Sequence, residues 1–432
     1  MRDQLQKWAY AFVPAMVVLV LGLWGLQSTT LWLDELVTLD AVTQGPFSRW
    51  EGDAQHVPYY LWMSLWSSPW SQVPDWWLRL PSTALLALGA LFVALTAGRL
   101  AGSRAGLAAG LFFAVMPGVG RYAQEARSPA VLVFFAALAT WLLVVALDKA
   151  RGARPWVIYG LVLVPMGLMQ PVSLALLAGH AVLVFSAVRG LRGAAPWLVA
   201  CLGAVPGVLF GVYNTRWVSA ISFIPAPQVR DAAAQVLAVP ISTSWFDTTS
   251  LAIGAALVAV SLTDRMGARW LVAYAVPVVA VWAASFGPTS LWLGRYLLPL
   301  SPLLAIAAGV SVKRVPWTQL ALLTAMLVLL AAPLWVDSRT AGGKDPTFGP
   351  DYRAAGQILQ DNARPGDSFL GEGRWEDYFN GLGVTRYLPA GVEIPAVSAN
   401  GHRVWSINHP DSCAQQQQWE IPSGTLRLCI EP

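Results

Sequence analysis

Residues 8–26, WAYAFVPAMVVLVLGLWGL, form the first long apolar run of the chain. A helix needs about 20 apolar residues to cross the roughly 30 Å hydrocarbon core of a bilayer, and this run has that length. Arg2 and Lys7 precede it, but no small-residue cleavage site follows it, so the pattern is not that of a signal peptide. We therefore predict an uncleaved membrane-spanning helix.

The composition of the whole chain also indicates an integral membrane protein. Of its 432 residues, 56% are hydrophobic and only 12% are charged, whereas soluble domains carry about 25% charged residues. The formal net charge of +4 does not indicate a nucleic-acid partner, because the excess Lys and Arg lie in short loops between apolar runs. The 22 Trp residues gather near the ends of these runs, as an interfacial aromatic belt requires.

The apolar runs predict an all-α polytopic bundle of about eleven transmembrane helices. The predicted spans are 8–26, 79–98, 105–120, 130–147, 156–170, 172–188, 196–212, 250–263, 268–286, 295–312 and 316–335. With a cytoplasmic N-terminus, every predicted inside connection is basic, as the positive-inside rule demands. These basic residues are Arg99, Arg104, Lys149, Arg151, Arg154, Arg189, Arg192, Arg265, Arg269, Lys313 and Arg314. We therefore predict a multi-pass protein of the cytoplasmic membrane with an extracytoplasmic C-terminus.

Two domains are expected. Residues 1–336 would form the transmembrane domain, with a long first outer loop at 27–78 and another outer loop at 213–249 that could cover a site. The composition becomes polar from about Asp337, so residues 337–432 predict a small extracytoplasmic α/β domain. In an oxidising compartment Cys413 and Cys429 of this domain are candidates for a disulfide.

The first outer loop opens with LWLDELVTLD, residues 31–40, directly after the first span. If this stretch is helical, Asp34 and Glu35 point about 100° apart and cannot have the same role. One acid could face a substrate while the other faces the backbone. Both could also be ordinary acids at a helix start, favoured by the helix macrodipole.

The other candidate residues for chemistry also fall in the predicted outer connections. They are Asp53, His56 and Tyr59 in the first loop, Arg79 in RLPS, the residues Arg121, Tyr122, Gln124, Glu125 and Arg127 of RYAQEAR, and Arg295 with Tyr296. Each has an ordinary alternative, such as a loop cap, an internal ion pair or an arginine that reaches lipid phosphates. Together they suit an anionic lipid-linked substrate. An arginine can hold a phosphate bidentately, and a carboxylate can take a proton from a hydroxyl.

The order of these motifs resembles the polytopic glycosyltransferases of the GT-C fold, in the family that includes protein O-mannosyltransferases and aminoarabinose transferases. The resemblance rests on five segments and covers roughly residues 8 to 335. The segments are LWLDE at 31–35, HVPYY at 56–60, RLPS at 79–82, YAQEAR at 122–127 and RYLLP at 295–299. One departure is His56-Val57-Pro58, where many relatives have two consecutive prolines.

The resemblance implies a sugar donor on a polyprenyl monophosphate and an inverting transfer outside the cytoplasm. Asp34 would be the general base, and Arg127 and Arg295, with Tyr122 and Arg121, would bind the donor phosphate. The remaining candidates, Glu35, Asp53, His56, Tyr59, Gln124, Glu125, Tyr296 and Arg79, would contact sugar or acceptor or orient the first loop. The resemblance specifies no cofactor other than a divalent metal, which stays open. Some relatives bind a divalent metal near the first loop, for which Asp53 and His56 would supply two ligands.

The leading hypothesis is therefore a membrane glycosyltransferase that moves a sugar, mannose by preference, from a polyprenyl phosphate to an extracytoplasmic hydroxyl. The acceptor would be a glycan, a glycolipid, a secreted polypeptide or an exported natural product. The alternative is a protein that binds or translocates polyprenyl phosphate or another lipid without chemistry. An intramembrane protease is not supported, because the sequence holds no HExxH motif and no paired mid-span aspartates.

Overall fold

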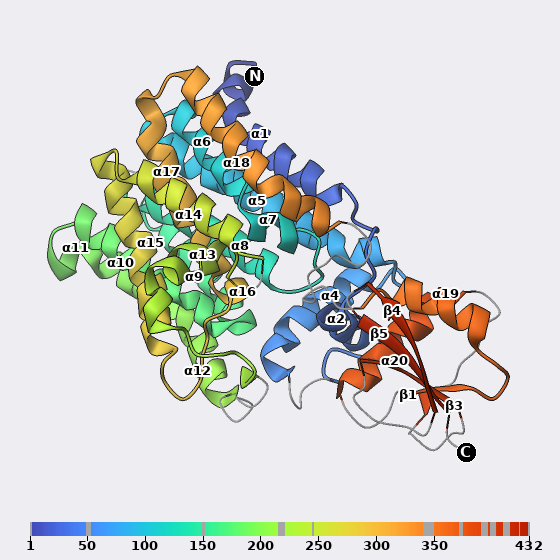
Figure 1. Cartoon of the computed structure of the whole chain (residues 1–432). Coiled ribbons are helices and arrows are strands. Elements are labelled where there is room, and N and C mark those ends of the chain that lie inside the picture. Colours follow the sequence, from blue (N-terminus) through green and yellow to red (C-terminus); the bar gives the residue numbers. More distant parts are fainter. Residues whose placement is uncertain are drawn as a thin grey trace. The chain divides into compact units, whose positions relative to one another are not determined.

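The structure is a computed structural model, and its helices and strands are labelled in Figure 1. It describes residues 2–48, 53–148, 152–214, 221–243, 246–339, 350–370, 375–389, 396–397, 403–408, 415–422 and 424–430. The chain divides into two compact units. The first comprises Met1–Leu23, Pro46–Leu65 and Arg79–Trp335, and the second comprises Trp24–Gly45, Trp66–Leu78 and Val336–Pro432.

Helices are the regular secondary structure of the described residues in the first unit. Its α-helices are α1 (Arg2–Leu23), α4 (Val57–Ser67), α5 (Asp75–Ala101), α6 (Ser103–Ala114), α7 (Pro117–Tyr122), α8 (Pro129–Ala146), α9 (Arg154–Met169), α10 (Leu176–Ala187), α11 (Gly190–Ala200), α12 (Val205–Tyr213), α13 (Ala232–Ala238), α14 (Thr248–Ser261), α15 (Arg265–Ala284), α16 (Gly294–Leu297), α17 (Ser301–Ser311) and α18 (Trp317–Asp337). Short 3₁₀ turns link several of them, among them η1 (Ala54–His56), η3 (Pro171–Ala175) and η7 (Val239–Ile241). Three of these helices cross a boundary between the units: the first unit holds α4 up to Leu65, α5 from Arg79 and α18 up to Trp335.

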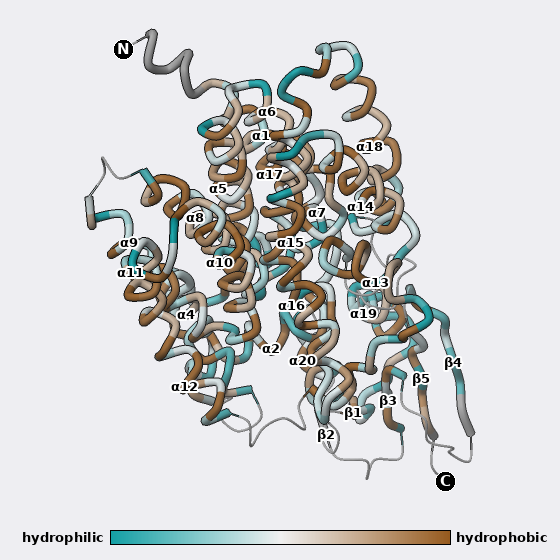
Figure 2. Tube along the Cα trace, turned by 90° about the vertical axis from the view of Figure 1, so that its left-hand side faces the viewer, coloured by the Kyte–Doolittle hydropathy of each residue, from teal (hydrophilic) through white to brown (hydrophobic). Residues whose placement is uncertain are grey.

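Six helical segments among the described residues are long and apolar enough to cross a membrane. They are Asp75–Ala101, Pro129–Ala146, Gly190–Tyr213, Arg265–Ala284, Gly294–Arg314 and Trp317–Asp337. Shorter apolar helices lie at Ala9–Leu23, Arg154–Met169, Pro171–Ala187 and Thr248–Ser261. Figure 2 shows the predominance of apolar residues along helices such as α8 and α10. The polytopic helical class is confirmed, and the count of about eleven spans stays a prediction.

Prolines mark a break within one predicted span and another between two neighbouring spans. The run at 105–120 becomes two helices, because α6 ends at Ala114 and Pro117 begins α7. Between the predicted spans 156–170 and 172–188, α9 ends at Met169 and Pro171 begins η3. Proline lacks the backbone N–H that would continue the helical ladder, but it is accepted in the first turn of a new helix.

Helix α17 forms the centre of the first unit. Nearly all of the Gly294–Arg314 segment is buried within the protein, whereas most of Trp317–Asp337 is not. Small residues allow α17 to approach α6 closely, because a Cβ atom on Gly309 would collide with Ala109. Such close packing of small residues is the usual way in which membrane helices gain contact area. The exposed apolar face of α18 fits a lipid environment.

The second unit contains α2 (Leu33–Gln44), α19 (Tyr352–Asn362), α20 (Trp375–Tyr387) and a five-stranded sheet. The strands are β1 (Ser368–Leu370), β2 (Ala396–Val397), β3 (Arg403–Ile407), β4 (Gln415–Ile421) and β5 (Gly424–Ile430), in the order β2-β1-β3-β5-β4. Strand β1 pairs in parallel with β2 and β3, and the remaining pairs are antiparallel. Helix α20 packs on β1 and β3, and α19 contacts α20 and β4 (Figure 1). The predicted small C-terminal sheet is thus present.

The division into units differs from the predicted boundary at residue 336. Two segments of the first outer loop, Trp24–Gly45 and Trp66–Leu78, group with the C-terminal residues rather than with the transmembrane helices. Within the second segment the rings of Trp66 and Trp77 stack at 4.4 Å. Each of these indoles donates to the backbone carbonyl of the other, at 2.9 and 3.1 Å. The part of the loop that carries Asp34 packs against α20.

The structure supports one half of the predicted disulfide. Cys201 is free, and Cys429 on β5 is disulfide-bonded. Cys413 lies outside the described residues, so its pairing with Cys429 stays a prediction.

Candidate active site

A buried polar cluster in the first unit joins two of the sequence motifs. His56 ends the η1 turn and Tyr60 lies one helical turn later on α4, so both side chains return toward Asp53. The His56 Nδ1 atom lies 2.5 Å from Asp53 Oδ1, and the Tyr60 hydroxyl donates to Asp53 Oδ2. Arg127, from RYAQEAR, donates through Nη1 to the Tyr60 oxygen at 2.7 Å and lies 3.8 Å from Asp53 Oδ2. Tyr60 thus bridges a carboxylate and a guanidinium.

The surroundings of Asp53 and Tyr60 favour a charged carboxylate beside a neutral phenol. Burial raises the pKa of Asp53, but His56, Arg127 and the Tyr60 hydroxyl outweigh burial, so that the pKa is lower than usual. Burial raises the pKa of Tyr60 well above its ordinary value. At neutral pH Asp53 is therefore a carboxylate and Tyr60 a neutral phenol. The single hydroxyl proton of Tyr60 is donated in the hydrogen bond to Asp53, and the Tyr60 oxygen accepts a hydrogen bond from Arg127.

The RYAQEAR motif is itself held in place by the helix that carries RLPS. Ser82 and Thr83 on α5 donate to the backbone carbonyls of Glu125 and Ala123, at 2.5 and 2.6 Å. Gln124 donates to the carbonyl of Gly22 at 2.9 Å. Two motifs that are far apart in the sequence therefore meet, and the segment that ends in Arg127 is tied down by hydrogen bonds at successive residues.

Arg121 and Glu125 form an ion pair of their own. The distance from Arg121 Nη1 to Glu125 Oε2 is 2.7 Å, and the side chains are only 8% and 1% exposed. The Arg121 guanidinium also lies 5.7 Å from the centre of the buried Tyr122 ring. A buried carboxylate offsets much of the charge that Arg121 could offer to a phosphate. This geometry favours a supporting role for Glu125 and Gln124 in the turn that precedes Arg127.

Arg295 lies beside the outer connection at 213–249. Its guanidinium is 5.8 Å from the centre of the Tyr296 ring, and Tyr296 packs with Leu293 and Ile224. Ser290 donates to the Pro225 carbonyl at 2.9 Å, and α16 contacts η7. The described part of the connection, 221–243, thus packs along the segment that carries Arg295. Arg79, another candidate, is 2% exposed at the start of the first-unit part of α5.

The predicted acid pair lies at the start of α2 in the second unit. Glu35 is fully buried, and its Oε2 atom accepts from the backbone N–H of Trp32 at 3.3 Å, which is half of a capping box. Asp34 is half-buried on the neighbouring face. The two acids differ in environment, as the 100° separation predicts. Glu35 orients the helix start, and Asp34 is the acid with access to solvent.

The sequence interpretation singled out Tyr59 and missed Tyr60. Tyr59 is fully buried, and its ring packs edge-on against Tyr60 at 6.1 Å. Tyr60 is the residue that bridges Asp53 and Arg127. The sequence contains a pattern that identifies Tyr60 as a partner of Asp53: Asp53, His56 and Tyr60 are spaced i, i+3 and i+7, the spacing of one helical face.

The described residues do not fit the divalent metal site that some relatives have. Among them, no group of three or more His, Cys, Asp and Glu side chains lies together. Asp53 and His56 hydrogen-bond to each other, and two ligands are too few for a confident site. No step of the mechanism below is therefore routed through a metal.

Apolar helices long enough to span a membrane and a small α/β unit give this chain the fold of the polytopic GT-C membrane glycosyltransferases. Residues 55–210 match the model of the family described as dolichyl-phosphate-mannose-protein mannosyltransferase. That segment includes HVPYY, RLPS and YAQEAR, so the resemblance drawn from these motifs is confirmed.

Two solved structures of ArnT show the same fold over nearly the whole chain. ArnT from Cupriavidus metallidurans in the apo state is 15% identical, with a TM-score of 0.60 and coverage of 98% of both chains. The same protein bound to undecaprenyl phosphate is 16% identical at a TM-score of 0.60, with coverage of 98% of this chain and 97% of that one. An oligosaccharyltransferase from Archaeoglobus fulgidus, in a complex with zinc and sulfate, is 13% identical at a TM-score of 0.49 and covers 92% of this chain and 67% of its own. No curated protein sequence matches the chain.

Proposed function

We propose that this protein transfers a sugar, mannose by preference, from a polyprenyl monophosphate to a hydroxyl of an extracytoplasmic acceptor. The observation that carries the proposal is the buried Asp53–Tyr60–Arg127 network, which joins HVPYY and YAQEAR within a GT-C fold. The ArnT structure with undecaprenyl phosphate supports a lipid phosphate as the donor group. The acceptor would be a glycan, a glycolipid, a secreted polypeptide or an exported natural product.

The proposed reaction is a single displacement at the anomeric carbon. Asp34 takes the proton of the acceptor hydroxyl, and the oxygen forms a bond to the anomeric carbon. The bond between that carbon and the phosphate oxygen breaks on the opposite face, so the configuration inverts. The electron pair leaves with the polyprenyl phosphate. Asp34 suits this role better than Glu35, whose buried carboxylate accepts from the backbone of Trp32.

The arginines would stabilise the negative charge that develops on the departing phosphate. Arg127 is the best candidate, since Tyr60 and the anchored RYAQEAR turn fix its guanidinium in one place. A preorganised donor of this kind stabilises the transition state without having to reorganise during the reaction. Arg295 would add a second positive charge, and Tyr122 would support the turn. Arg121, paired with Glu125, contributes less.

The orientation of the protein follows the charges of its connections. We propose that the N-terminus lies in the cytoplasm and that the motif-bearing connections and the C-terminal unit lie outside. This assignment rests on the basic residues of the alternate connections and on the positive-inside rule. The disulfide at Cys429 agrees with an oxidising compartment on that side. The membrane would be the cytoplasmic one.

The test compares wild type with Asp34→Asn in the same bilayer. Purified protein in nanodiscs receives radiolabelled polyprenyl-phosphate mannose and a cell-envelope extract, and the label in acceptor is counted. We expect wild type to transfer and Asp34→Asn to lose at least about 100-fold in rate, since general base catalysis contributes 10²–10⁴-fold. Both proteins should bind the lipid donor equally.

Three outcomes would contradict parts of the proposal. Equal transfer by both proteins would remove Asp34 as the base. Transfer from another lipid-phosphate sugar but none from the mannose donor would overturn the choice of sugar. Tight lipid binding by wild type without transfer from a panel of such donors would favour the alternative, a protein that binds or translocates polyprenyl phosphate.

A further inference from the structure

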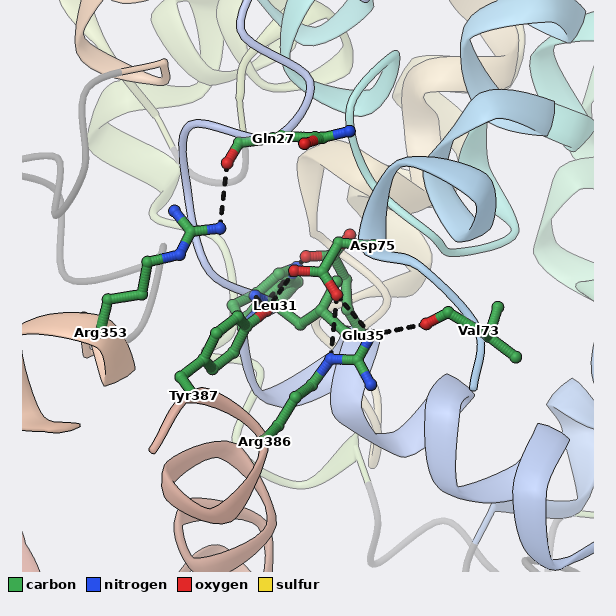
Figure 3. A network of polar contacts seen from close by, with 9 residues as sticks. Gln27, Leu31, Glu35, Val73, Asp75, Arg353, Arg386 and Tyr387 are labelled. Atoms are coloured by element: carbon green, nitrogen blue, oxygen red, sulfur yellow. Dashed lines mark hydrogen bonds and ion pairs between the residues drawn. The ribbon is translucent and has the colours of Figure 1, made fainter. Parts of the chain in front are cut away.

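The last residues of α20 hold a carboxylate that belongs to the first outer loop. Arg386 contacts Asp75 Oδ1 through Nη2 at 2.6 Å and through Nε at 2.9 Å, and Nη2 also donates to the Val73 carbonyl at 2.6 Å. The neighbouring Tyr387 donates its hydroxyl to Asp75 Oδ2 at 2.5 Å. Both oxygens of Asp75 are thus occupied by adjacent residues of one helix (Figure 3).

Tyr387 also forms a hydrogen bond with the residues before α2. Its oxygen accepts from the backbone N–H of Leu31 at 2.8 Å. Because a phenol has one proton, the bond to Asp75 decides where that proton lies and leaves the oxygen to accept from Leu31. Leu31 is 0% exposed and lies two residues before α2 begins at Leu33. The network drawn in Figure 3 also includes Glu35.

Further bonds from the C-terminal residues reach α2 itself and the stretch before it. Tyr378 on α20 donates to Asp40 Oδ1 at 2.8 Å, and Asp40 is 2% exposed. Arg353 on α19 donates to the carbonyls of Gln27 and Ser28, each at 3.0 Å. The stretch before α2 and the middle of the helix are therefore each attached to the C-terminal helices. All of these residues belong to the second unit.

We propose that Asp75, Arg386 and Tyr387 form a latch that positions the start of α2 and, with it, the carboxylate of Asp34. The inference rests on the proposed role of Asp34 as the base. It gives the C-terminal unit a defined part in the reaction: its helices set the placement of a catalytic group that is carried by the first outer loop. The three latch residues are positioning residues, since none of them needs to touch the substrate.

The first test separates positioning from binding. Tyr387→Phe keeps the ring but removes the hydroxyl, and Asp75→Asn keeps the shape but removes the charge. A displacement of about 1 Å in a catalytic group can cost about 100-fold in rate. We expect each variant to lower kcat between about 10-fold and 100-fold, with KM for the lipid donor unchanged. The double variant should be little worse than either single one, because both act through one latch.

The matched control is Arg403→Gln. It breaks another arginine–aspartate pair of the same domain, Arg403 to Asp367 at 2.7 Å, with arginine side-chain exposure of 21% against 22% for Arg386. Arg403 lies on β3, and none of its described hydrogen bonds reaches the first outer loop. We expect its kcat to stay within about twofold of wild type.

A second measurement does not depend on any transfer activity. Hydrogen–deuterium exchange in nanodiscs is followed for peptides that cover 31–44 in wild type, Tyr387→Phe, Asp75→Asn and Arg403→Gln. We expect faster exchange in the two latch variants only. If wild type transfers no sugar, the proposed function fails, but the exchange data still decide whether the latch exists. Unchanged exchange in both latch variants, or faster exchange with an unchanged kcat, would overturn the inference.

Discussion

Tyr60→Phe removes one hydroxyl group from between two opposite charges. That hydroxyl donates to Asp53 and accepts from Arg127 at 2.7 Å. A hydrogen bond to a charged group contributes about 1.5–3 kcal/mol. The direct attraction between Arg127 and Asp53, 3.8 Å apart, would recover part of the loss. We therefore expect the free energy of unfolding to fall by about 2–3 kcal/mol, for two lost bonds with partial compensation.

The same substitution should also slow transfer. Without the Tyr60 oxygen, the Arg127 guanidinium loses one of the contacts that fix its position. If about 1.4–2.8 kcal/mol of transition-state stabilisation is lost, kcat/KM falls by about 10- to 100-fold. The assays are denaturant unfolding in micelles, followed by tryptophan fluorescence, and initial rates of sugar transfer.

The control is the same change at the adjacent residue. Tyr59→Phe leaves the bonds among Asp53, Tyr60 and Arg127 in place, so its effects on stability and rate should be smaller. The reasoning would be refuted if Tyr60→Phe stayed within about 0.5 kcal/mol of wild type, the range of ordinary surface substitutions. Equal losses for the two variants would refute it as well.

Two further predictions concern acid stability and helix packing. Because the folded pKa of Asp53 is lowered, its contribution to stability is present above the unfolded pKa of about 3.9 and is lost as the pH falls through the folded value. The Tm difference between wild type and Asp53→Asn should therefore be largest above about pH 5 and shrink below about pH 4; a gap that widens in acid would contradict this. Gly309→Ala should destabilise the protein by about 1–3 kcal/mol, because the new methyl group collides with Ala109. The control Gly89→Ala, whose Cβ would meet its nearest neighbour at 3.8 Å, should be neutral or stabilising in the same unfolding assay, and equal losses would exclude the packing explanation.

Patterns of neighbouring residues are enough to predict that this is a polytopic membrane protein and to predict much of its local structure. Length and hydropathy decide whether a segment can cross a bilayer, and both are properties of consecutive residues. The same holds for helix ends at proline and for the capping role of Glu35, which needs only a residue three positions away. The motifs HVPYY and YAQEAR are also runs of consecutive residues, and they indicate the GT-C resemblance without reference to any tertiary contact.

Which side chains meet depends on the fold of the whole chain. Tyr60 rather than Tyr59 bridges Asp53 to Arg127, because the helical turn from His56 directs its hydroxyl to that carboxylate. The α2 segment packs with the C-terminal helices, through pairs such as Tyr378 and Asp40 that are 338 residues apart. Local periodicity carries no information about such partners. They are selected by which arrangement of the whole unit satisfies its buried charges, and that arrangement exists only in the folded chain.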